Sequence, residues 1–323
     1  MAEKKSAKAK TPAPLKFVNL RKAYGEALLE AGKTNKDVVV LEADLRKSTM
    51  SFMFREAFPD RFFEMGIAEQ NMLSTAAGLA ASGKIPFCST FSVFAAGRAY
   101  DQIRQTIAIG RLNVKICGSS AGLSDFGDGS THQSVEDIAL MCAIPGMTVL
   151  APCDAEETRQ AVRAAAEIDG PVFIRVIRND LPALIPEGGA FTGEPRALRE
   201  GSDVLILAHG CMTSRAMDAA TLLEAKGISS KVVNVPMLKP FPYDAIAGMA
   251  ANVKAVVAAE DHSFIGGLAS AVAFALRGSA TPMAYVAIED QFGQSAHALE
   301  DLMEHYRLTA GHIVENALEL LGS

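Results

Sequence analysis

The sequence predicts an α/β fold of two consecutive α/β domains, each with a mostly parallel sheet flanked by helices. Short apolar runs with strand character alternate along the chain with longer segments of helical periodicity. A Pro- and Gly-rich stretch interrupts this alternation, which then resumes. A length of 323 residues also corresponds to about two domains. We therefore expect a first domain at 15–182, a linker at 183–201 and a second domain at 202–323.

The elements of the first domain alternate regularly. A helical face runs from Phe17 to Leu28. Further helices are predicted at 50–58, 69–82, 95–109, 135–142 and 154–167, and strands at 38–41, 61–65, 86–90, 114–117, 148–151 and 172–177. Ligands bind at the carboxyl ends of the strands in such sheets. The loops to inspect therefore follow Leu41, Met65, Thr90, Cys117 and Ile177.

The second domain repeats the pattern with strands at 204–208, 231–235, 255–259 and 284–288 and a last helix at 310–321. His262 follows the third of these strands, so we expect it to line a cleft. The remaining histidines of this domain are expected to be ordinary surface or packing residues; they are His209, His297, His305 and His312. No cluster has metal-ligand spacing, and neither a G-x-S-x-G elbow nor a P-loop occurs.

The composition is that of a soluble globular protein, with 49% hydrophobic and 21% charged residues. A net charge of −6 gives no bulk electrostatic reason to bind nucleic acid. No apolar run approaches the roughly 20 residues of a membrane helix. Five cysteines without a C-x-x-C pair favour reduced thiols. We expect a cytoplasmic protein without membrane or nucleic-acid partners, with a disordered Lys/Ala/Pro-rich tail at 1–14.

Three stretches carry polar chemistry next to predicted strand ends. In Gly66–Met72 a glycine closes a strand and a glutamate opens a helix. Ser89–Phe94 ends a strand with two aromatic residues three apart, and Asp125–Gln133 is a Gly-rich loop with two acids and a histidine. Arginine suits the binding of planar anions. Taken singly, however, arginines such as Arg175 are expected to form surface salt bridges of small effect.

Six motifs in order resemble the transketolase family of thiamine-diphosphate enzymes. They are Leu20–Ala23, Glu42–Leu45, Gly66–Gln70, Thr90–Phe94, Asp128–Gln133 and Arg178–Pro182. The resemblance runs from about Phe17 to the C-terminus, and it is to the C-terminal half of a transketolase that exists as a separate subunit. It implies a pyrimidine-binding domain followed by a transketolase C-terminal domain.

The resemblance also implies a cofactor site for thiamine diphosphate. Glu69 matches the residue that hydrogen-bonds the aminopyrimidine ring and promotes proton removal from the cofactor. Phe94 and, secondarily, Phe91 are expected to pack against this ring. Asp44 matches a family acid near the ring system, and Ile67 belongs to the same cofactor-binding set.

The resemblance implies substrate contacts as well. His132 matches a residue that contacts hydroxyl and carbonyl oxygens of the donor sugar, and Asp128 matches an acid that contacts an acceptor hydroxyl. Together with Glu69 they form the expected catalytic set. Further matches to phosphate-binding positions are Arg21, Ser48 and Arg178. A further family histidine for this phosphate would fall near Gly118, where none stands, so another anionic or branched sugar stays open.

The family's metal-diphosphate motif is absent in its expected form. In the family, G-D-G is followed further on by an asparagine, whereas Gly127–Gly129 is followed in that range by Pro152–Asp154. We therefore expect no metal site in this chain. A partner subunit corresponding to the N-terminal half should bind the diphosphate with Mg²⁺ or Ca²⁺, and by analogy the assembly is an α2β2 heterotetramer.

The implied activity is that of a transketolase subunit in carbohydrate metabolism, which transfers a two-carbon ketol unit from a ketose, expected to be phosphorylated, to an aldose. Three alternatives stay open. The chain also resembles 1-deoxyxylulose-5-phosphate synthase, through Gly66–Gln70 and Arg98–Gln102. A 2-oxoacid dehydrogenase E1 beta-like subunit has similar length and the same two domains. A catalytically silent regulatory subunit is the non-enzymatic alternative.

Overall fold

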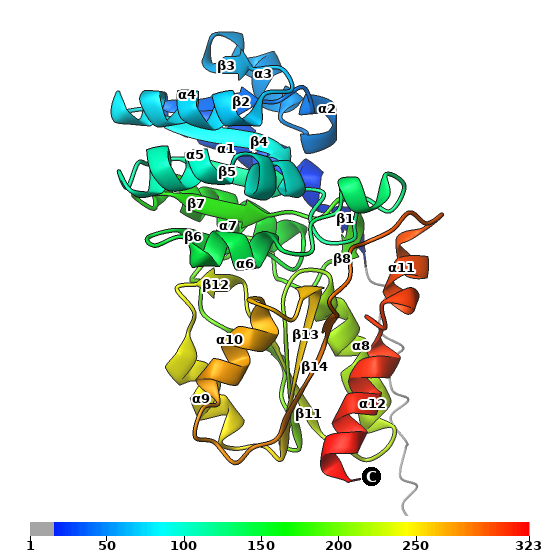
Figure 1. Cartoon of the computed structure of the whole chain (residues 1–323). Helices are drawn as coiled ribbons and strands as arrows, with labels where there is room; N and C mark the ends of the chain where they lie inside the picture. The colour runs from blue at the N-terminus through cyan, green and yellow to red at the C-terminus, as the bar shows by residue number, and fades with distance from the viewer. Residues whose placement is uncertain (1–15, 323) are drawn as a thin grey trace, which may run out of the picture.

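A computed structural model of the chain describes residues 16–322, so the tail predicted at 1–14 lies outside the described residues. The chain forms two α/β units stacked end to end, the earlier one drawn blue to green and the later one mainly yellow to red (Figure 1). This arrangement confirms the predicted fold class. Within residues 16–322, no helix has both the length and the apolar character needed to cross a membrane.

The first sheet has seven strands in the order β12-β6-β7-β5-β4-β2-β3. Its parallel strands are β2 (Val38–Glu42), β3 (Phe62–Glu64), β4 (Ile85–Phe91), β5 (Lys115–Ser119), β6 (Thr148–Leu150) and β7 (Val172–Arg175). The edge strand β12 (Met237–Lys239) runs antiparallel to β6 and comes from the later part of the chain. The backbone of the second unit therefore extends the sheet of the first.

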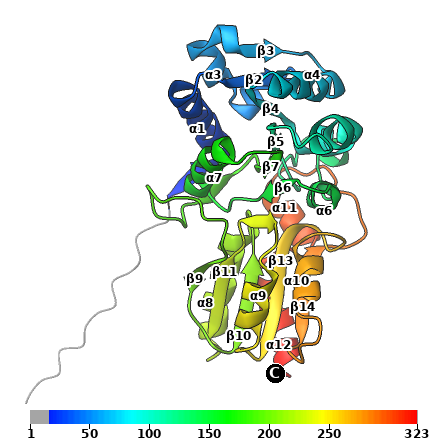
Figure 2. The same cartoon turned by 90° about the vertical axis from the view of Figure 1, so that its left-hand side faces the viewer.

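Helices cover both faces of this sheet (Figure 2). On one face lie α1 (Leu20–Thr34) and α7 (Ala155–Glu167), while α4 (Glu69–Ala81) and α6 (Asp137–Ala143) lie on the other. Both α1 and α7 begin with a side-chain cap: Asn19 accepts from the Lys22 amide at 3.0 Å, and Asp154 from the Glu157 amide at 2.8 Å. Short helical segments complete this domain: α2 (Arg46–Thr49), α3 (Phe52–Ala57), η1 (Pro59–Arg61) and η4 (Gly129–Thr131).

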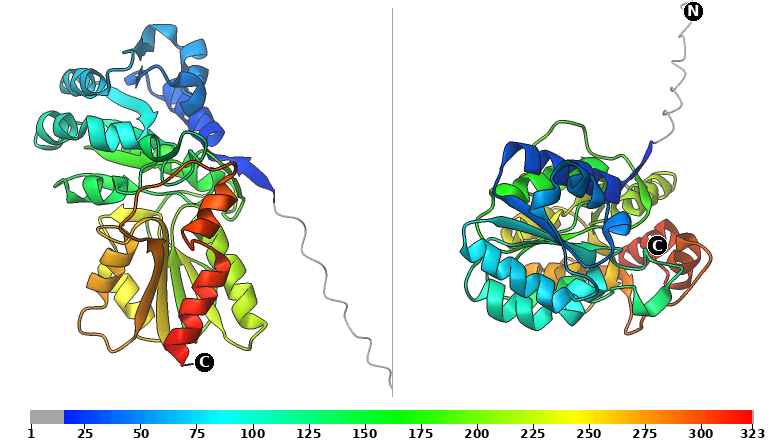
Figure 3. Two further views of the ribbon diagram at one scale, coloured as in Figure 1. Left: turned by 45° about the vertical axis from the view of Figure 1, so that its right-hand side comes forward. Right: turned by 90° about the horizontal axis from the view of Figure 1, so that it is seen from above.

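The second sheet has five strands in the order β14-β13-β10-β11-β9. They are β9 (Arg196–Arg199), β10 (Val204–Ala208), β11 (Ser230–Asn234), β13 (Ala255–Ser263) and β14 (Met283–Ile288). Its helices are α8 (Met212–Glu224), α9 (Tyr243–Ala250), α10 (Leu268–Ala275), α11 (Leu299–His305) and α12 (Ala310–Leu321). The C-terminal helix α12 packs beside α8 (Figure 3).

Several local expectations differ from the structure. Phe17 lies not in a helix but in β1 (Phe17–Asn19), which pairs antiparallel with β8 (Asp180–Pro182). Its side chain is 63% exposed, so it is not part of the buried helical face. Within the segment expected to be a linker, β9 pairs antiparallel with β11 and extends the second sheet. These short strands were missed because their pairing partners are distant in sequence.

Two predicted helices are also interrupted. The helix expected at 50–58 begins only at Phe52, because Met50 adopts a left-handed conformation with φ 63°. The helix expected at 95–109 is replaced by two π-helical segments, η2 (Phe94–Arg98) and η3 (Ile103–Ala108), around the short α5 (Tyr100–Gln102). Such π segments occur frequently at functional sites.

Glu42 ends β2 as a fully buried carboxyl group. Its Oε2 accepts the Leu45 N–H at 2.6 Å, and its Oε1 accepts the Thr49 hydroxyl at 3.0 Å. Burial raises the pKa of Glu42 to about 8, although both hydrogen bonds act in the opposite direction. An unfolded Glu has a pKa of about 4.3. The stabilisation from the bound proton is therefore complete below that value and is lost as pH rises through about 8.

We expect Glu42→Gln to become more stable relative to wild type as pH rises from about 5 to about 8, because glutamine needs no proton to stay neutral. The free energies of unfolding should diverge by at most about 1.4 kcal/mol per pH unit. Urea unfolding across this range measures the effect. Glu30→Gln, at an exposed position of α1, is the control. A pH-independent difference for Glu42→Gln would contradict the prediction.

Candidate active site

The first sheet has a topological switch point between β2 and β4. After β2 the chain passes to β3 on one side, then crosses through α4 to β4 on the other side of β2. Ligands of open parallel sheets bind at the carboxyl ends of strands at such a point. The predicted residues Asp44 and Phe91 follow β2 and end β4, respectively.

Glu69 is the first residue of α4, and its side chain is only 1% exposed. The helix has no side-chain cap at Ala68, so the carboxylate itself lies at the positive end of the helix dipole. Its Oε2 accepts a hydrogen bond from Nη1 of Arg98 at 2.7 Å. A buried carboxyl group therefore lies at this edge of the sheet with a guanidinium partner.

Phe91, Phe94 and His132 form an aromatic cluster close to Glu69. The two phenylalanine rings are stacked with centroids 5.9 Å apart and planes 14° apart. The His132 ring lies edge-on to both, with centroids 6.1 Å from Phe91 and 5.4 Å from Phe94. Its Nδ1 is 2.9 Å from the hydroxyl oxygen of Thr131, which orients the imidazole. Phe91 is buried, whereas Phe94 and His132 are half-buried, so the accessible part of the cluster is the Phe94 ring with the polar imidazole beside it.

Arg98 connects Glu69 to the aromatic cluster, and the sequence reasoning did not identify it as a site residue. Its guanidinium carbon lies 4.5 Å from the Phe94 ring centroid while Nη1 binds Glu69. The available signal was its spacing, because residues four apart lie on the same face of a helical segment. Glu69, Phe94 and Arg98 thus form one contiguous contact set.

The other predicted cofactor and catalytic residues lie at the margin. Ile67 is 76% exposed just before α4. Asp44 has φ 62°; its amide donates to Oε1 of Glu64 at 2.8 Å, and its carboxylate lies 3.8 Å from Arg46. Asp128 is exposed on the loop that carries His132. The structure therefore brings Glu69, the aromatic cluster and Arg98 together. Asp44 instead contacts Arg46 and Glu64.

The three residues predicted to bind phosphate are joined by hydrogen bonds. Arg21 Nε donates to the Arg178 carbonyl at 3.1 Å, and Arg21 Nη1 donates to the Ser48 carbonyl at 3.0 Å. Arg178 Nη1 also contacts Oδ2 of Asp125 at 2.9 Å. Burial, followed by the neighbouring Arg178 charge, lowers the pKa of Arg21. Two positive charges therefore act on one another here, and one of them is paired with Asp125. We name Arg21, Ser48 and Arg178 the anion cluster.

Gly118 has no space for the additional histidine found in the resembled family. A Cβ at Gly118 would lie 2.6 Å from the Phe173 ring and 2.7 Å from the Ser92 hydroxyl. The missing histidine is therefore a consequence of tight packing between β5 and its neighbours. An anion held here depends on the anion cluster rather than on this position.

Two expectations about buried residues were wrong. Arg175 is not a surface residue but is 2% exposed at the end of β7, where it contacts Asp137 and Asp261. His262 does not line a cleft: β13 continues to Ser263 and carries the fully buried His262 between the domains. Sequence patterns missed both because the covering element comes from another domain.

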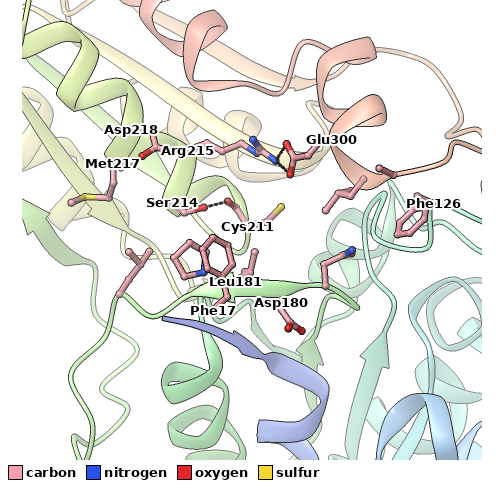
Figure 4. Close-up of a pocket in the computed structure, with 15 residues that line it drawn as sticks. Phe17, Phe126, Asp180, Leu181, Cys211, Ser214, Arg215, Met217, Asp218 and Glu300 are labelled. Atoms are coloured by element: carbon pink, nitrogen blue, oxygen red, sulfur yellow. Dashed lines mark hydrogen bonds and ion pairs between the residues drawn. The ribbon is translucent and has the colours of Figure 1, made fainter. Parts of the chain in front are cut away.

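A hollow of about 660 Å³ lies between the domains (Figure 4), and neither Glu69 nor the aromatic cluster lines it. Arg215 Nη2 lies 2.8 Å from Oε2 of Glu300, and this ion pair is drawn at one side of the hollow in Figure 4. Asp180 and Asp218 also line the hollow. Three carboxylates and one guanidinium do not suit an anionic substrate, so this hollow is not the candidate site.

The donor groups at the site fit the aminopyrimidine ring of thiamine diphosphate. Glu69 is a buried carboxyl group that can share a proton with a ring nitrogen, and Phe91 and Phe94 supply a stacking surface. In the part of the chain that the structure describes, no group of three or more His, Cys, Asp or Glu side chains is arranged to hold a metal ion.

Comparisons with known proteins identify the family of the chain. Residues 16–183 match the family described as transketolase, pyrimidine binding domain, and residues 193–313 match transketolase, C-terminal domain. The chain is 42% identical over 308 residues to a putative transketolase C-terminal section of Methanocaldococcus jannaschii, which covers 94% of this chain and 96% of the relative. It is 41% identical over 303 residues to the 6-deoxy-6-sulfo-D-fructose transketolase subunit SqwH of Clostridium sp. (strain MSTE9), covering 93% and 94%.

A solved structure described as a split gene transketolase, inactive beta4 tetramer, superposes with a TM-score of 0.86. It shares 46% sequence identity, and the match covers 94% of this chain and 98% of the other. The similarity therefore extends over both domains and over nearly the whole of the compared chain.

We expect Arg98→Met to lower the free energy of unfolding by about 1 kcal/mol, because it leaves the buried Glu69 carboxylate without its partner. The value is small because the Arg98 side chain is 45% exposed. In a Glu69→Gln background the same substitution should cost less. Denaturant unfolding of the two single variants and the double variant measures this. Arg104→Met, at an exposed position of η3, is the control. Equal losses in both backgrounds would refute the coupling.

Proposed function

The chain belongs to the transketolase family, and from this premise we propose that it is one subunit of a split transketolase. It transfers a two-carbon ketol unit from a ketose to an aldose together with a partner subunit. The observation that carries the proposal is the buried Glu69 carboxyl group next to the stacked Phe91 and Phe94 rings. A catalytic acid–base group and an aromatic surface at one strand edge are what an aminopyrimidine cofactor requires.

In the proposed enzyme, Glu69, Phe91 and Phe94 hold the aminopyrimidine of thiamine diphosphate. When bound, this cofactor supplies the nucleophilic carbon that accepts the two-carbon unit. Glu69 is only 1% exposed, so little water competes for its carboxyl oxygens, through which it can exchange a proton with the ring. His132 lies edge-on to both rings and offers Nε2 to sugar oxygens.

The proposed site is incomplete without a second subunit. The exposed Ile67 and the half-buried Phe94 and His132 leave one side of the cofactor pocket uncovered. A partner corresponding to the N-terminal half of a transketolase would cover it and bind the diphosphate with Mg²⁺ or Ca²⁺. The related chain described as an inactive beta4 tetramer supports a subunit that does not act alone. We propose an α2β2 assembly in the cytoplasm.

The proposed donor is a ketose with a terminal anionic group, either a phosphate or a sulfonate. The anion cluster supports this class, since Arg21 and Arg178 present two neighbouring guanidinium groups. A relative at 41% identity is named for a 6-deoxy-6-sulfo sugar, so a sulfonate is tested beside a phosphate.

A tagged pull-down from the native host tests the two-subunit arrangement. We expect a co-purifying chain that carries the G-D-G…N motif, together with bound thiamine diphosphate. Release of carbon dioxide from pyruvate would favour the 1-deoxyxylulose-5-phosphate synthase-like alternative, and lipoamide-dependent oxidation the E1 beta-like one. A chain that purifies alone and without cofactor would favour a regulatory role.

In the assembled complex, Glu69→Ala and Glu69→Gln should reduce ketol transfer by a factor of about 10²–10⁴, because the general acid–base group is lost. The measurement is steady-state turnover with saturating cofactor. Glu304→Gln, at an exposed position of α11, should retain full activity. Turnover above a few per cent of wild type in Glu69→Ala would exclude the proposed role.

We expect Arg178→Ala to raise the KM for fructose 6-phosphate or 6-deoxy-6-sulfofructose at least tenfold. A hydrogen bond to a charged group contributes about 1.5–3 kcal/mol, whereas uncharged fructose makes no such contact and should react as before. Comparing kcat/KM for the charged and uncharged sugars isolates the anion contribution. Arg163→Ala, on the outer surface of α7, is the matched control. Equal losses for both kinds of sugar would argue against the anion cluster.

A further inference from the structure

A buried chain of polar contacts runs from the second domain to the aromatic cluster. Asp261 of β13 accepts from Arg175 Nη1 at 2.7 Å, and its carbonyl accepts from Nη2 at 3.0 Å. Arg175 Nε donates to both carboxylate oxygens of Asp137, at 3.0 and 3.2 Å. The hydroxyl of Ser92 donates to Asp137 Oδ2 at 2.7 Å. We name Ser92, Asp137, Arg175 and Asp261 the interdomain relay.

The end of the interdomain relay coincides with the candidate cofactor site. Ser92 directly follows Phe91 and lies two residues before Phe94. The Ser92 side chain has little room to move, because Gly118 packs closely against it. A Cβ added at Gly118 would lie 2.7 Å from the Ser92 hydroxyl. A hydrogen bond that fixes Ser92 therefore fixes the turn between the two stacked rings.

At its other end the relay is enclosed just as tightly. A Cβ at Gly122 would clash with Oδ2 of Asp261 and would lie 2.9 Å from Nη2 of Arg175. Burial alone would lower the pKa of Arg175, but the charges of Asp137 and Asp261 raise it above its usual range. All four relay side chains are at most 2% exposed. The guanidinium stays charged, and because it is buried, solvent cannot readily replace a lost partner.

Burial of an ion pair is a costly way to join two domains, because desolvation offsets most of the attraction. A second buried contact between the domains does not reach the site: Asn234 of β11 donates to both oxygens of Glu157 on α7, at 2.8 Å each. The interdomain relay thus differs from the Asn234–Glu157 contact because it ends at Ser92, next to the aromatic cluster.

We propose that Ser92, Asp137, Arg175 and Asp261 are positioning residues, through which the second domain holds Phe91 and Phe94 in the arrangement that receives the cofactor ring. The second domain then has a defined part in cofactor binding although it contributes no residue to the aromatic cluster. That the second domain fixes Phe91 and Phe94 is argued from the contacts alone. That this arrangement receives the cofactor ring rests on the proposed function.

Hydrogen exchange of the full chain, without partner or cofactor, tests whether the second domain restrains the segment that carries Phe91 and Phe94. Asp261→Asn keeps the size of the side chain and removes its charge, and it should speed amide exchange in 89–98 about fivefold or more. Asn234→Ala is the matched control; it should speed exchange near Glu157 but leave 89–98 within about twofold of wild type. No change in 89–98 with Asp261→Asn, or an equal change with Asn234→Ala, would overturn the proposal.

Ser92→Ala gives the reciprocal measurement if Asp261→Asn does not fold. The substitution removes one hydroxyl. Because coupling between two sites is reciprocal, it should also speed amide exchange around 259–263 in the second domain. Unchanged exchange there would overturn the proposal equally.

Cofactor titration of the assembled complex tests the second part. Ser92→Ala and Asp261→Asn should each raise the Kd for thiamine diphosphate about tenfold, and the double variant should be little worse than either. The KM for the sugar should stay within about twofold, which separates positioning from general damage. If the effects of the two single substitutions on Kd add up in the double variant, the proposal that the two residues act through one relay is overturned. Coupled exchange in a chain that binds no thiamine diphosphate with its partner would instead refute the proposed function and leave the relay standing.

Discussion

The two domains meet around one guanidinium group, that of Arg175, which lies between Asp137 and Asp261. A charge buried this completely is tolerated only while all of its partners remain in place. The constraint fixes the end of β7, the start of α6 and β13 relative to one another. Because α6 and the end of β4 are linked through Ser92, the constraint reaches the edge of the sheet where Phe91 and Phe94 lie.

The site itself follows from sheet topology. The chain changes direction at β2, so the carboxyl ends of β2 and β4 are free of a crossing connection and can receive a ligand. Around this opening the backbone departs from regular structure, with left-handed Asp44 and Met50 and the π-helical η2 and η3. The π segment η2 carries both Phe94 and Arg98, and the resulting contacts place an aromatic face and a cation next to Glu69.

Polar groups from several elements gather around the carboxyl ends of these strands. Glu69 begins α4 next to the aromatic cluster, and the anion cluster joins the start of α1 to the segments after β2 and β7. Under the proposed function, the first group would hold the cofactor ring and the second the charged end of the substrate, whose binding energy can orient it. The matches to the transketolase pyrimidine binding and C-terminal domains cover residues 16–183 and 193–313, so the family similarity extends over both domains.

Local patterns in the sequence determined the alternating elements, the two-domain α/β class and the family, because strand and helix periodicity and short motifs are encoded by neighbouring residues. The family resemblance also selected Glu69, Phe91, Phe94 and His132, which the structure brings together. Only the tertiary structure decided the rest. Arg98 became a site residue through a π-helical turn, β12 joined the first sheet from the second half of the chain, and Arg175 was buried by β13. Each of these features joins segments that are far apart in sequence. The interactions that stabilise it therefore form only when those segments have packed together.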